Sequence, residues 1–278
     1  MTVRIVTDST CDLPADIIDK YSIWVLPLYI NVGKQGYLDG IDITRQEFYA
    51  QLPYFPVHPT TAAPSPEKFR ALYNALADEG ASEVLSIHIS ASMSAVVDVA
   101  TLAAQDITSV PVTVLDSGQL SLGTGFLVET AAQLAAQGLS ISEMQPLLTA
   151  QKKRTHVFAA LDTMEFLKRS GRVNGIVARL GSFLKIKPIM KMHDGTPSAD
   201  RVRTHSHAIR HMVQLLTQLT PLERLAFVHT HAPQYVEELR DHVAHLLPST
   251  DVLSVDITPV IGAHIGPGAA GFTVITAP

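Results

Sequence analysis

Three loops in the first half of the sequence carry clustered hydroxyl groups, and each follows a segment whose pattern predicts a strand. They are Asp8-Ser9-Thr10, Ser90-Ala91-Ser92-Met93-Ser94 and Asp116-Ser117-Gly118. In an open parallel sheet, ligands bind beyond the carboxyl ends of the strands, where such loops converge. Helix N-termini at that edge offer N–H groups to an anion. Because the same hydroxyl groups also suit simple helix caps, the loops alone leave both interpretations open.

A basic cluster in the second half is a candidate counterpart of these loops. It runs Lys168-Arg169-Ser170-Gly171-Arg172, and Arg179, Lys185 and Lys187 follow it. One arginine facing the hydroxyl groups across a cleft would make an anion clamp, whereas the alternative is a solvated surface. Apolar residues interleaved there would either line a cavity or fill a core; they are Ile176, Val177, Leu180, Phe183, Leu184, Ile186, Ile189 and Met190.

A second hydroxyl pair, Thr60-Thr61, lies in a segment rich in proline. The segment Leu52–Pro66 contains five prolines, which restrict the backbone and would hold these hydroxyl groups in place. An ordinary surface loop is the simpler interpretation of this segment.

His229-Thr230-His231 is the best candidate for a metal site. Both imidazoles would share one face if the preceding strand continued through them. A self-sufficient, metal-assisted hydrolase using His229 and His231 is therefore an alternative function. No suitably placed cysteine or acidic cluster completes the ligand set, which counts against it.

The sequence fulfils neither of two common nucleotide-binding signatures. Gly266-Pro267-Gly268-Ala269-Ala270-Gly271 spells G-x-G-x-x-G, but a dinucleotide site needs a following helix, and the segment that follows reads as a strand. The sequence has no G-x-x-x-x-G-K-[ST] loop. We therefore expect no cofactor and no binding of ATP by this chain.

Strands and helices alternate through the first half. We expect strands at Val3–Thr7, Ile23–Ile30, Glu83–Ile89 and Val112–Leu115, with helices after Pro14, Thr44 and Pro66 and over Ser94–Asp106 and Leu120–Ala136. Asp12 would cap the helix that begins at Pro14. Such alternation predicts a mostly parallel sheet with flanking helices.

The second half has a different pattern. Asp194-Gly195 predicts a hairpin between strands Lys185–Met192 and Ser198–Val202. Further strands are expected at Thr155–Leu161, Arg224–His229, Val252–Asp256 and Phe272–Thr276, with helical segments around Thr163–Arg169 and Gly175–Phe183 and helices at Thr204–Leu219 and Gln234–Leu247. The sequence thus predicts an α/β protein of two domains, residues 1–150 mostly parallel and residues 151–278 mixed α+β, with a ligand between them.

Composition narrows the function classes. The 278 residues are 46% hydrophobic and 17% charged, with a formal charge of −5 and no basic tract, so nucleic acid is not the expected partner. No apolar run reaches the ~18 residues of a spanning helix, so stable membrane insertion is not expected. The single cysteine, Cys11, and the lack of a signal peptide suit a reducing, cytoplasmic location.

Taken in order, eight segments resemble the DegV family across nearly the whole chain. They are Val6–Pro14, Thr61–Pro66, Ile89–Ser94, Asp116-Ser117, Arg169–Val173, Leu184–Ile189, Arg201–Thr204 and His264–Gly268. Any one of these motifs is weak, but eight in the family's order are specific. Ala62-Ala63, Ala91 and Ala95 stand where the family usually has other residues, which alters the polar shell beside Thr61 and Ser94.

The resemblance implies a long-chain fatty acid whose tail lies buried between two α/β domains. It further implies a binding subunit of a bacterial fatty-acid kinase, in phospholipid metabolism, that is not catalytic alone and works with a separate ATP-binding kinase subunit. By motif, Thr61, Ser94, Ser92, Arg172 and His264 would meet the carboxylate. Arg201 and Arg203 would face the kinase. A lipid-binding regulator without a kinase partner is a further alternative.

Overall fold

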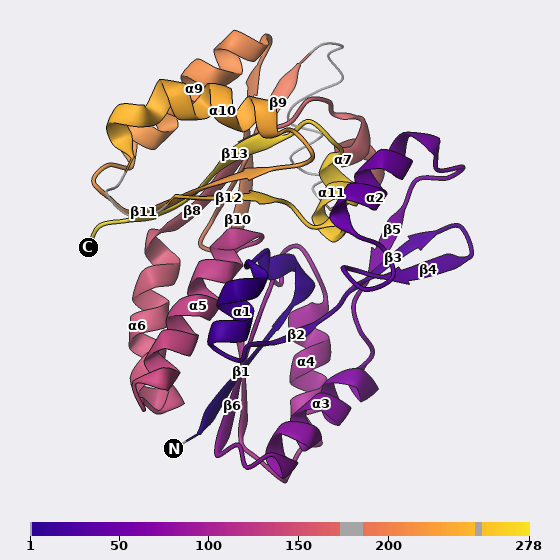
Figure 1. Ribbon diagram of the computed structural model, residues 1–278, viewed down its shortest axis with the longest axis vertical. Coiled ribbons are helices and arrows are strands. Elements are labelled where there is room, and N and C mark those ends of the chain that lie inside the picture. The colour runs from indigo at the N-terminus through magenta and orange to yellow at the C-terminus, as the bar shows by residue number, and fades with distance from the viewer. Residues whose placement is uncertain (1, 173–185, 248–251) are drawn as a thin grey trace.

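The computed structural model describes residues 2–172, 186–247 and 252–278 and contains two large sheets (Figure 1). The N-terminal sheet has the order β2-β1-β6-β7, and its strands are β1 (Val3–Asp8), β2 (Trp24–Leu26), β6 (Glu83–His88) and β7 (Val112–Asp116). All three strand pairs in it are parallel. The mostly parallel sheet predicted for the first half is therefore confirmed.

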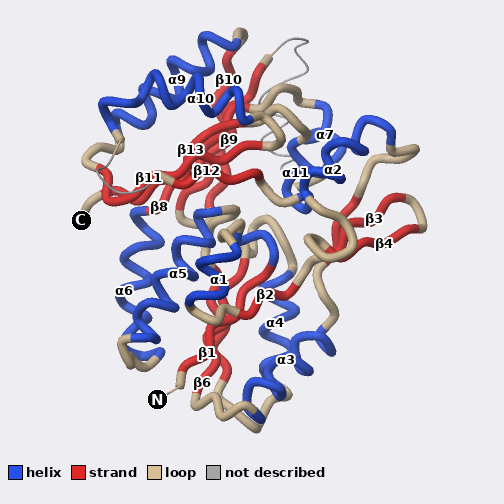
Figure 2. The backbone as a smooth tube through the Cα atoms, viewed as in Figure 1, coloured by secondary structure: helices blue, strands red, loops and turns tan. Residues whose placement is uncertain are grey.

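Helices cover both faces of the N-terminal sheet (Figure 2). On one face lie α1 (Ala15–Lys20), α5 (Leu122–Ala136) and α6 (Ile141–Arg154). On the other lie α3 (Pro66–Asp78) and α4 (Val96–Gln105). The side chains that cover each face are apolar, so this arrangement buries both faces of the parallel strands.

The C-terminal sheet has the order β10-β9-β8-β13-β11-β12. Its strands are β8 (Thr155–Ala160), β9 (Lys187–His193), β10 (Thr196–Val202), β11 (Leu222–His229), β12 (Leu253–Asp256) and β13 (Ala270–Thr276). Only β11 and β12 pair in parallel, and the hairpin predicted at Asp194-Gly195 joins β9 to β10. α9 (His205–Gln218) and α10 (Pro233–Val243) cover one face of this sheet, as Figure 1 shows above it.

The opposite face of the C-terminal sheet packs toward the N-terminal half. One continuous apolar core joins Ile5 and Leu85 of the first sheet with Ala226 and Val228 of the second. Fold class is thus as predicted, an α/β protein with a parallel and a mixed sheet. The division of the chain at residue 150 stays a prediction.

A small three-stranded sheet, absent from our expectations, lies beside the junction of the two halves. Its order is β4-β3-β5, with strands β3 (Tyr29–Val32), β4 (Gln35–Leu38) and β5 (Thr60–Ala62). The expected single strand Ile23–Ile30 is split at Pro27-Leu28 between β2 and β3. Two short helices, α2 (Arg45–Gln51) and η2 (Leu52–Tyr54), connect β4 to β5. Near this sheet lie α7 (Glu165–Ser170) and α11 (Pro259–Ile265), which pack on each other.

None of the described helices combines the length and the apolar character that crossing a bilayer would require. The predicted helical segment Gly175–Phe183 lies outside the described residues.

Candidate functional site

A cavity of about 520 Å³ lies where the two halves and the small sheet meet. This volume is within the range of about 300–1,000 Å³ typical of small-molecule sites. Its wall is predominantly apolar; the lining includes Ile89, Leu120, Val157, Ala159, Leu161, Met190, Met192, Val228 and Ile261. Because these side chains come from loops after strands β6 and β7 of the N-terminal sheet, from the C-terminal sheet and from α11, the cavity exists only when the halves are packed together.

Five predicted site residues line this one cavity: Thr61, Ser92, Ser94, Arg172 and His264. We call them the polar wall. They come from β5, from the loop between β6 and α4, from the segment after α7 and from α11. The structure therefore brings together residues up to 203 positions apart, although their predicted contact with a carboxylate stays a prediction. None of the described residues that line the cavity is acidic.

His264 is the most constrained member of the polar wall. Its Nε2 lies 2.8 Å from Oγ1 of Thr61. Its Nδ1 is buried and has no hydrogen-bond partner among the described residues. Burial, reinforced by the positive charge of Arg172 and by His58, lowers the pKa of His264 to about 4. The imidazole is thus neutral at pH 7, and an anion in the cavity would favour its protonation.

Two hydrogen bonds to Ser170 fix the position of Arg172. Its backbone N–H donates to Ser170 Oγ at 3.2 Å, and its guanidinium donates to the Ser170 carbonyl at 3.2 Å. Gly171 ends α7 in the left-handed region, at φ 68°, which turns the chain toward the cavity. The guanidinium is exposed and so can meet a charge that arrives at the cavity mouth.

The loop that carries Ser92 and Ser94 is fixed from both sides. Asp8 Oδ2 accepts a hydrogen bond from Ile89 N at 3.1 Å, and Asp116 Oδ1 accepts one from Ala91 N at 3.3 Å. Of the three hydroxyl loops in the sequence, only this one lines the cavity. Asp8 and Asp116 of the other two loops position it, so of the two interpretations that the sequence left open, a lining role applies to this loop alone.

Asp8 belongs to a buried polar chain that we call the Asp8 cluster: Asp8, Thr10, Tyr73, Ser86 and His88. His88 Nδ1 lies 2.9 Å from Asp8 Oδ2, and His88 Nε2 lies 2.7 Å from Ser86 Oγ, which accepts from Tyr73 OH at 2.8 Å. Burial acts to raise the pKa of Asp8, but its hydrogen bonds with His88, Thr10 and Ile89 outweigh that and lower it. All five side chains are fully buried, so the cluster fastens β1 to β6 and α3 rather than reaching a substrate.

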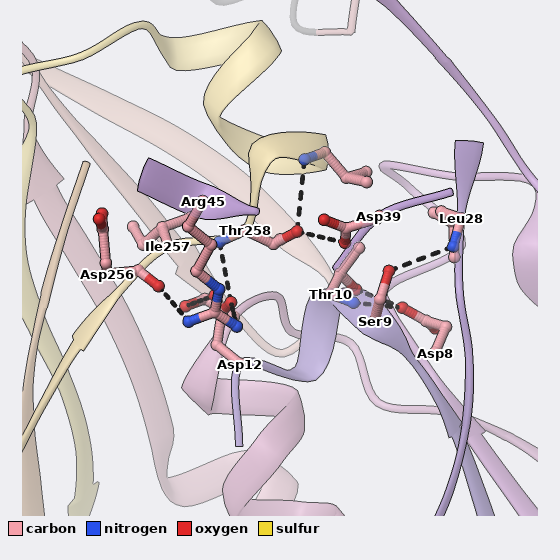
Figure 3. Close-up of polar contacts among 12 residues, drawn as sticks. Asp8, Ser9, Thr10, Asp12, Leu28, Asp39, Arg45, Asp256, Ile257 and Thr258 are labelled. Atoms are coloured by element: carbon pink, nitrogen blue, oxygen red, sulfur yellow. Dashed lines mark hydrogen bonds and ion pairs between the residues drawn. The ribbon is translucent and has the colours of Figure 1, made fainter. Parts of the chain in front are cut away.

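A second group, the Asp12 cluster, comprises Asp12, Asp39, Arg45 and Thr258, which Figure 3 labels, together with Ser121. Asp12 Oδ1 accepts from Thr258 N at 2.9 Å and pairs with Arg45 Nη2 at 3.0 Å, and Oδ2 accepts from Ser121 Oγ at 2.6 Å. Asp12 therefore does not cap the helix after it, contrary to the sequence prediction. Burial raises the pKa of Asp12 to about 6 against the opposing effect of Arg45.

Of the remaining predicted residues that the structure describes, Arg201 and Arg203 do not line the cavity. Arg201 is exposed on β10, an edge strand, and Arg203 is exposed in the turn that follows it. Of the three described apolar residues that follow the basic cluster, Met190 lines the cavity, while Ile186 and Ile189 pack into cores. Ile176, Val177, Arg179, Leu180, Phe183, Leu184 and Lys185 lie outside the described residues.

The histidine pair proposed for a metal does not share a face. β11 ends at His229, and His231 turns away with φ 52° to stack on the Tyr49 ring, with centroids 5.9 Å apart. Asp256 approaches both imidazoles, at 3.5 Å and 4.0 Å. Within residues 2–172, 186–247 and 252–278, no group of three or more His, Cys, Asp or Glu side chains could hold a metal ion. Support for the hydrolase alternative is therefore lacking.

Comparisons with known proteins agree with this architecture. The model of the DegV family, described as an uncharacterised protein family, matches residues 2–277. A DegV domain-containing protein of Streptomyces coelicolor is 34% identical over 98% of each chain. A DegV family protein of Thermus thermophilus, whose structure is described by its fatty-acid binding, is 35% identical over 100% of both chains, with a TM-score of 0.91.

Another solved structure, DegV of Bacillus subtilis, is described as a fatty acid binding protein; it is 26% identical over 100% of both chains, with a TM-score of 0.90. Both the sequence and the fold therefore match along the full length, and the chain belongs to the DegV family.

Proposed function

We propose that this protein binds one long-chain fatty acid and presents its carboxylate to a separate ATP-binding kinase subunit. The observation that carries the proposal is the apolar cavity whose polar wall contains Thr61, His264 and Arg172. The description of the Thermus thermophilus and Bacillus subtilis relatives as fatty-acid-binding supports the choice of ligand. In this proposal the lipid is a ligand of the protein. The protein itself has the cytoplasmic location that the sequence predicts.

The energetics favour such a ligand. Burying ~14 methylenes contributes up to about 11 kcal/mol before the costs of ordering. Burying a bare carboxylate would oppose this strongly, so the head group needs hydrogen-bond donors. The hydroxyl group of Thr61 and the ring of His264 share one hydrogen bond at 2.8 Å, so with a neutral ring the pair offers one free donor to the head group, either Thr61 O–H or His264 Nδ1–H.

The same geometry suits phosphorylation of the carboxylate by an external enzyme. Hydroxyl and neutral imidazole groups hold the carboxylate without cancelling its charge, so that its oxygen stays nucleophilic toward a phosphoryl donor. The acyl phosphate carries more negative charge than the carboxylate. Arg172 would therefore stabilise the negative charge that gathers at the carboxylate in the transition state of phosphoryl transfer more than it stabilises the bound substrate, which is the differential binding that catalysis requires. Arg201 and Arg203 would lie on the face offered to the kinase.

Native mass spectrometry of the purified protein, before and after denaturation with organic extraction, tests the ligand. We expect a mass difference that matches a long-chain carboxylic acid. Empty protein that fails to take up added hexadecanoic acid would contradict the proposal.

Matched ligands and variants test the polar wall. Thr61→Ala and His264→Ala should each weaken hexadecanoic acid binding by about 10- to 100-fold, the size of a lost hydrogen bond to a charged group. Both should leave hexadecan-1-ol binding nearly unchanged. The control, Ala159→Leu, extends a side chain into the apolar part of the cavity and should weaken acid and alcohol alike. If the two head-group variants bind the acid normally, the assignment of the carboxylate to this wall is wrong.

The kinase step needs its own assay. Acyl phosphate should form only when ATP and the kinase subunit are both added, and Arg172→Ala should slow its formation while sparing lipid binding. Arg201→Ala and Arg203→Ala should raise the concentration of lipid-loaded protein that the kinase needs. Lipid-loaded protein that yields no acyl phosphate with any kinase subunit of its own cell would favour the lipid-binding regulator.

A further inference from the structure

The Asp12 cluster lies between the N-terminal half and the start of α11. Asp12 follows the short helix η1 (Ser9–Cys11) and adopts φ 55°, a left-handed conformation that is uncommon for a residue with a side chain. Its carboxylate is fully buried and meets Thr258 N, Ser121 Oγ and the Arg45 guanidinium. Figure 3 shows Thr258 between Asp12 and Asp39. An isolated buried carboxylate is costly, so its three partners indicate a position that is held firmly.

Three consecutive residues before α11 are each held by side chains of the N-terminal half. Arg45 Nη1 donates to the Asp256 carbonyl, and Tyr49 OH donates to the Ile257 carbonyl at 2.9 Å. Thr258 donates its N–H to Asp12 and its hydroxyl to Asp39. The same Thr258 hydroxyl oxygen accepts from Val260 N at 3.3 Å and so begins α11. The start of this helix is therefore defined by groups from the other half of the molecule.

The position of Thr258 affects that of His264 in the polar wall, because Thr258 is the N-cap of α11 and His264 lies in this helix. His264 follows Thr258 by six residues, which corresponds to about 9 Å along a helix. The helix also packs tightly on α2, because a Cβ at Gly262 would lie 2.2 Å from Tyr49 OH. A displacement of Thr258 would therefore move His264 relative to Thr61, which lies on a different element, β5.

We infer that Asp12 is a positioning residue of the carboxylate site, which sets the His264–Thr61 contact through Thr258 and α11. The inference rests on the proposed function, because it assumes that this contact receives the fatty-acid head group. It assigns a role to an acidic residue that does not itself line the cavity. A purely structural role predicts something different, since a buried ion pair that only holds the fold would affect lipid tail and head group alike.

The decisive experiment measures the ratio of affinities for hexadecanoic acid and hexadecan-1-ol in Asp12→Asn. Asparagine keeps the size of the side chain but loses the charge that meets Arg45 and one of the two acceptor oxygens. We expect acid binding to weaken about 10-fold and alcohol binding to change less than about twofold. The NMR signals of the His264 ring should shift in the same variant without ligand.

A second variant, Tyr49→Phe, removes the hydrogen bond to the Ile257 carbonyl in the same segment. It should also lower the affinity for hexadecanoic acid relative to that for hexadecan-1-ol. The control is Leu148→Ala, which opens a cavity in the fully packed core of α6. It should destabilise the protein and leave the ratio as in the wild type.

Each outcome separates the two proposals. If the wild-type protein does not prefer the acid, the proposed carboxylate site fails. If the wild type prefers the acid, and Asp12→Asn and Tyr49→Phe keep the wild-type ratio, the positioning role of Asp12 is wrong. Equal weakening of acid and alcohol in both variants would also overturn it, because that result describes a structural role.

Discussion

The Asp8 and Asp12 clusters begin in the same short loop after β1 but fasten different parts of the molecule. The Asp8 cluster joins four elements of the N-terminal half, β1, η1, α3 and β6, all within residues 8–88. The Asp12 cluster joins that half to residues 256–258, which lead into α11. Burial acts to raise the pKa of both carboxyl groups, but the contacts of Asp8 with His88, Thr10 and Ile89 N outweigh it and lower that pKa, whereas at Asp12 burial prevails and raises the pKa to about 6. Asp8 thus stabilises contacts within the N-terminal half. Asp12, whose charged form is penalised by burial at neutral pH, instead links the two halves.

The largest difference is expected in unfolding free energy at pH 7. Asp8→Ala leaves His88 Nδ1 and Ile89 N without their acceptor and should cost about 3–5 kcal/mol. Asp12→Ala should cost less, about 1–3 kcal/mol, because the penalty of burying the charge outweighs the favourable contacts at Asp12 but not at Asp8. Urea denaturation of both variants measures the difference. Equal costs would mean that the two buried carboxylates are equivalent.

The pH dependence of stability should separate the clusters next. The pKa of Asp12 rises from 3.8 to about 6 on folding. The stability it contributes is therefore present below pH 3.8 and is lost as pH rises through 6. This corresponds to about 3 kcal/mol at most. Urea denaturation at several pH values measures this effect. As pH rises from 4 to 7, the unfolding free energy of the wild type should fall relative to that of Asp12→Asn.

Asp8→Asn should show the opposite sign. The pKa of Asp8 is lowered on folding, so its contribution is present above pH 3.8 and is lost as pH falls below that value. The wild type should therefore lose its advantage over Asp8→Asn in acid. If the difference in unfolding free energy between wild type and variant changes with pH in the same direction for Asp8→Asn and Asp12→Asn, the contrast between the clusters is wrong.

The smallest effects should come from a matched pair of tyrosines. Tyr73→Phe removes the hydrogen bond to Ser86, and Tyr49→Phe removes the one to the Ile257 carbonyl. Each should lower unfolding free energy by about 1 kcal/mol. Only Tyr49→Phe should also reduce the preference for hexadecanoic acid over its alcohol, by a few-fold in a displacement assay. Tyr73→Phe with an equally reduced preference would erase the distinction.

Much of the fold could be predicted because its elements carry local signals. The capping box at Thr44–Glu47, the helix beginning at Pro66 and the hairpin at Asp194-Gly195 are all present. Helix α6 and the small sheet were missed. Strand β5 has only three residues between prolines, and its pairing with β3 is a long-range contact that periodicity does not reveal.

The polar wall was predicted through family resemblance rather than through spacing. Thr61 and His264 are 203 residues apart, so no local pattern could join them. Helix α11, which carries His264, was not predicted, although Thr258-Pro259 is a recognisable N-cap and N1 pair. The sequence leaves the loop of Asp8 open between a ligand site and a helix cap, and it predicts Asp12 as a helix cap. Their true partners, at residues 88 and 258, are fixed by tertiary packing that the sequence does not display.

Strand order in the C-terminal sheet has a consequence for biosynthesis. β13 lies between β8 and β11, although residues 270–276 follow both of those strands in sequence. While a ribosome is making the protein, the strands β8 and β11, which contribute Val157, Ala159 and Val228 to the cavity, therefore have a gap between them until β13 is added. Closing that gap requires contacts between distant segments, which form slowly. Under the proposed function, lipid would therefore be loaded only after β13 has been made and has inserted into the sheet.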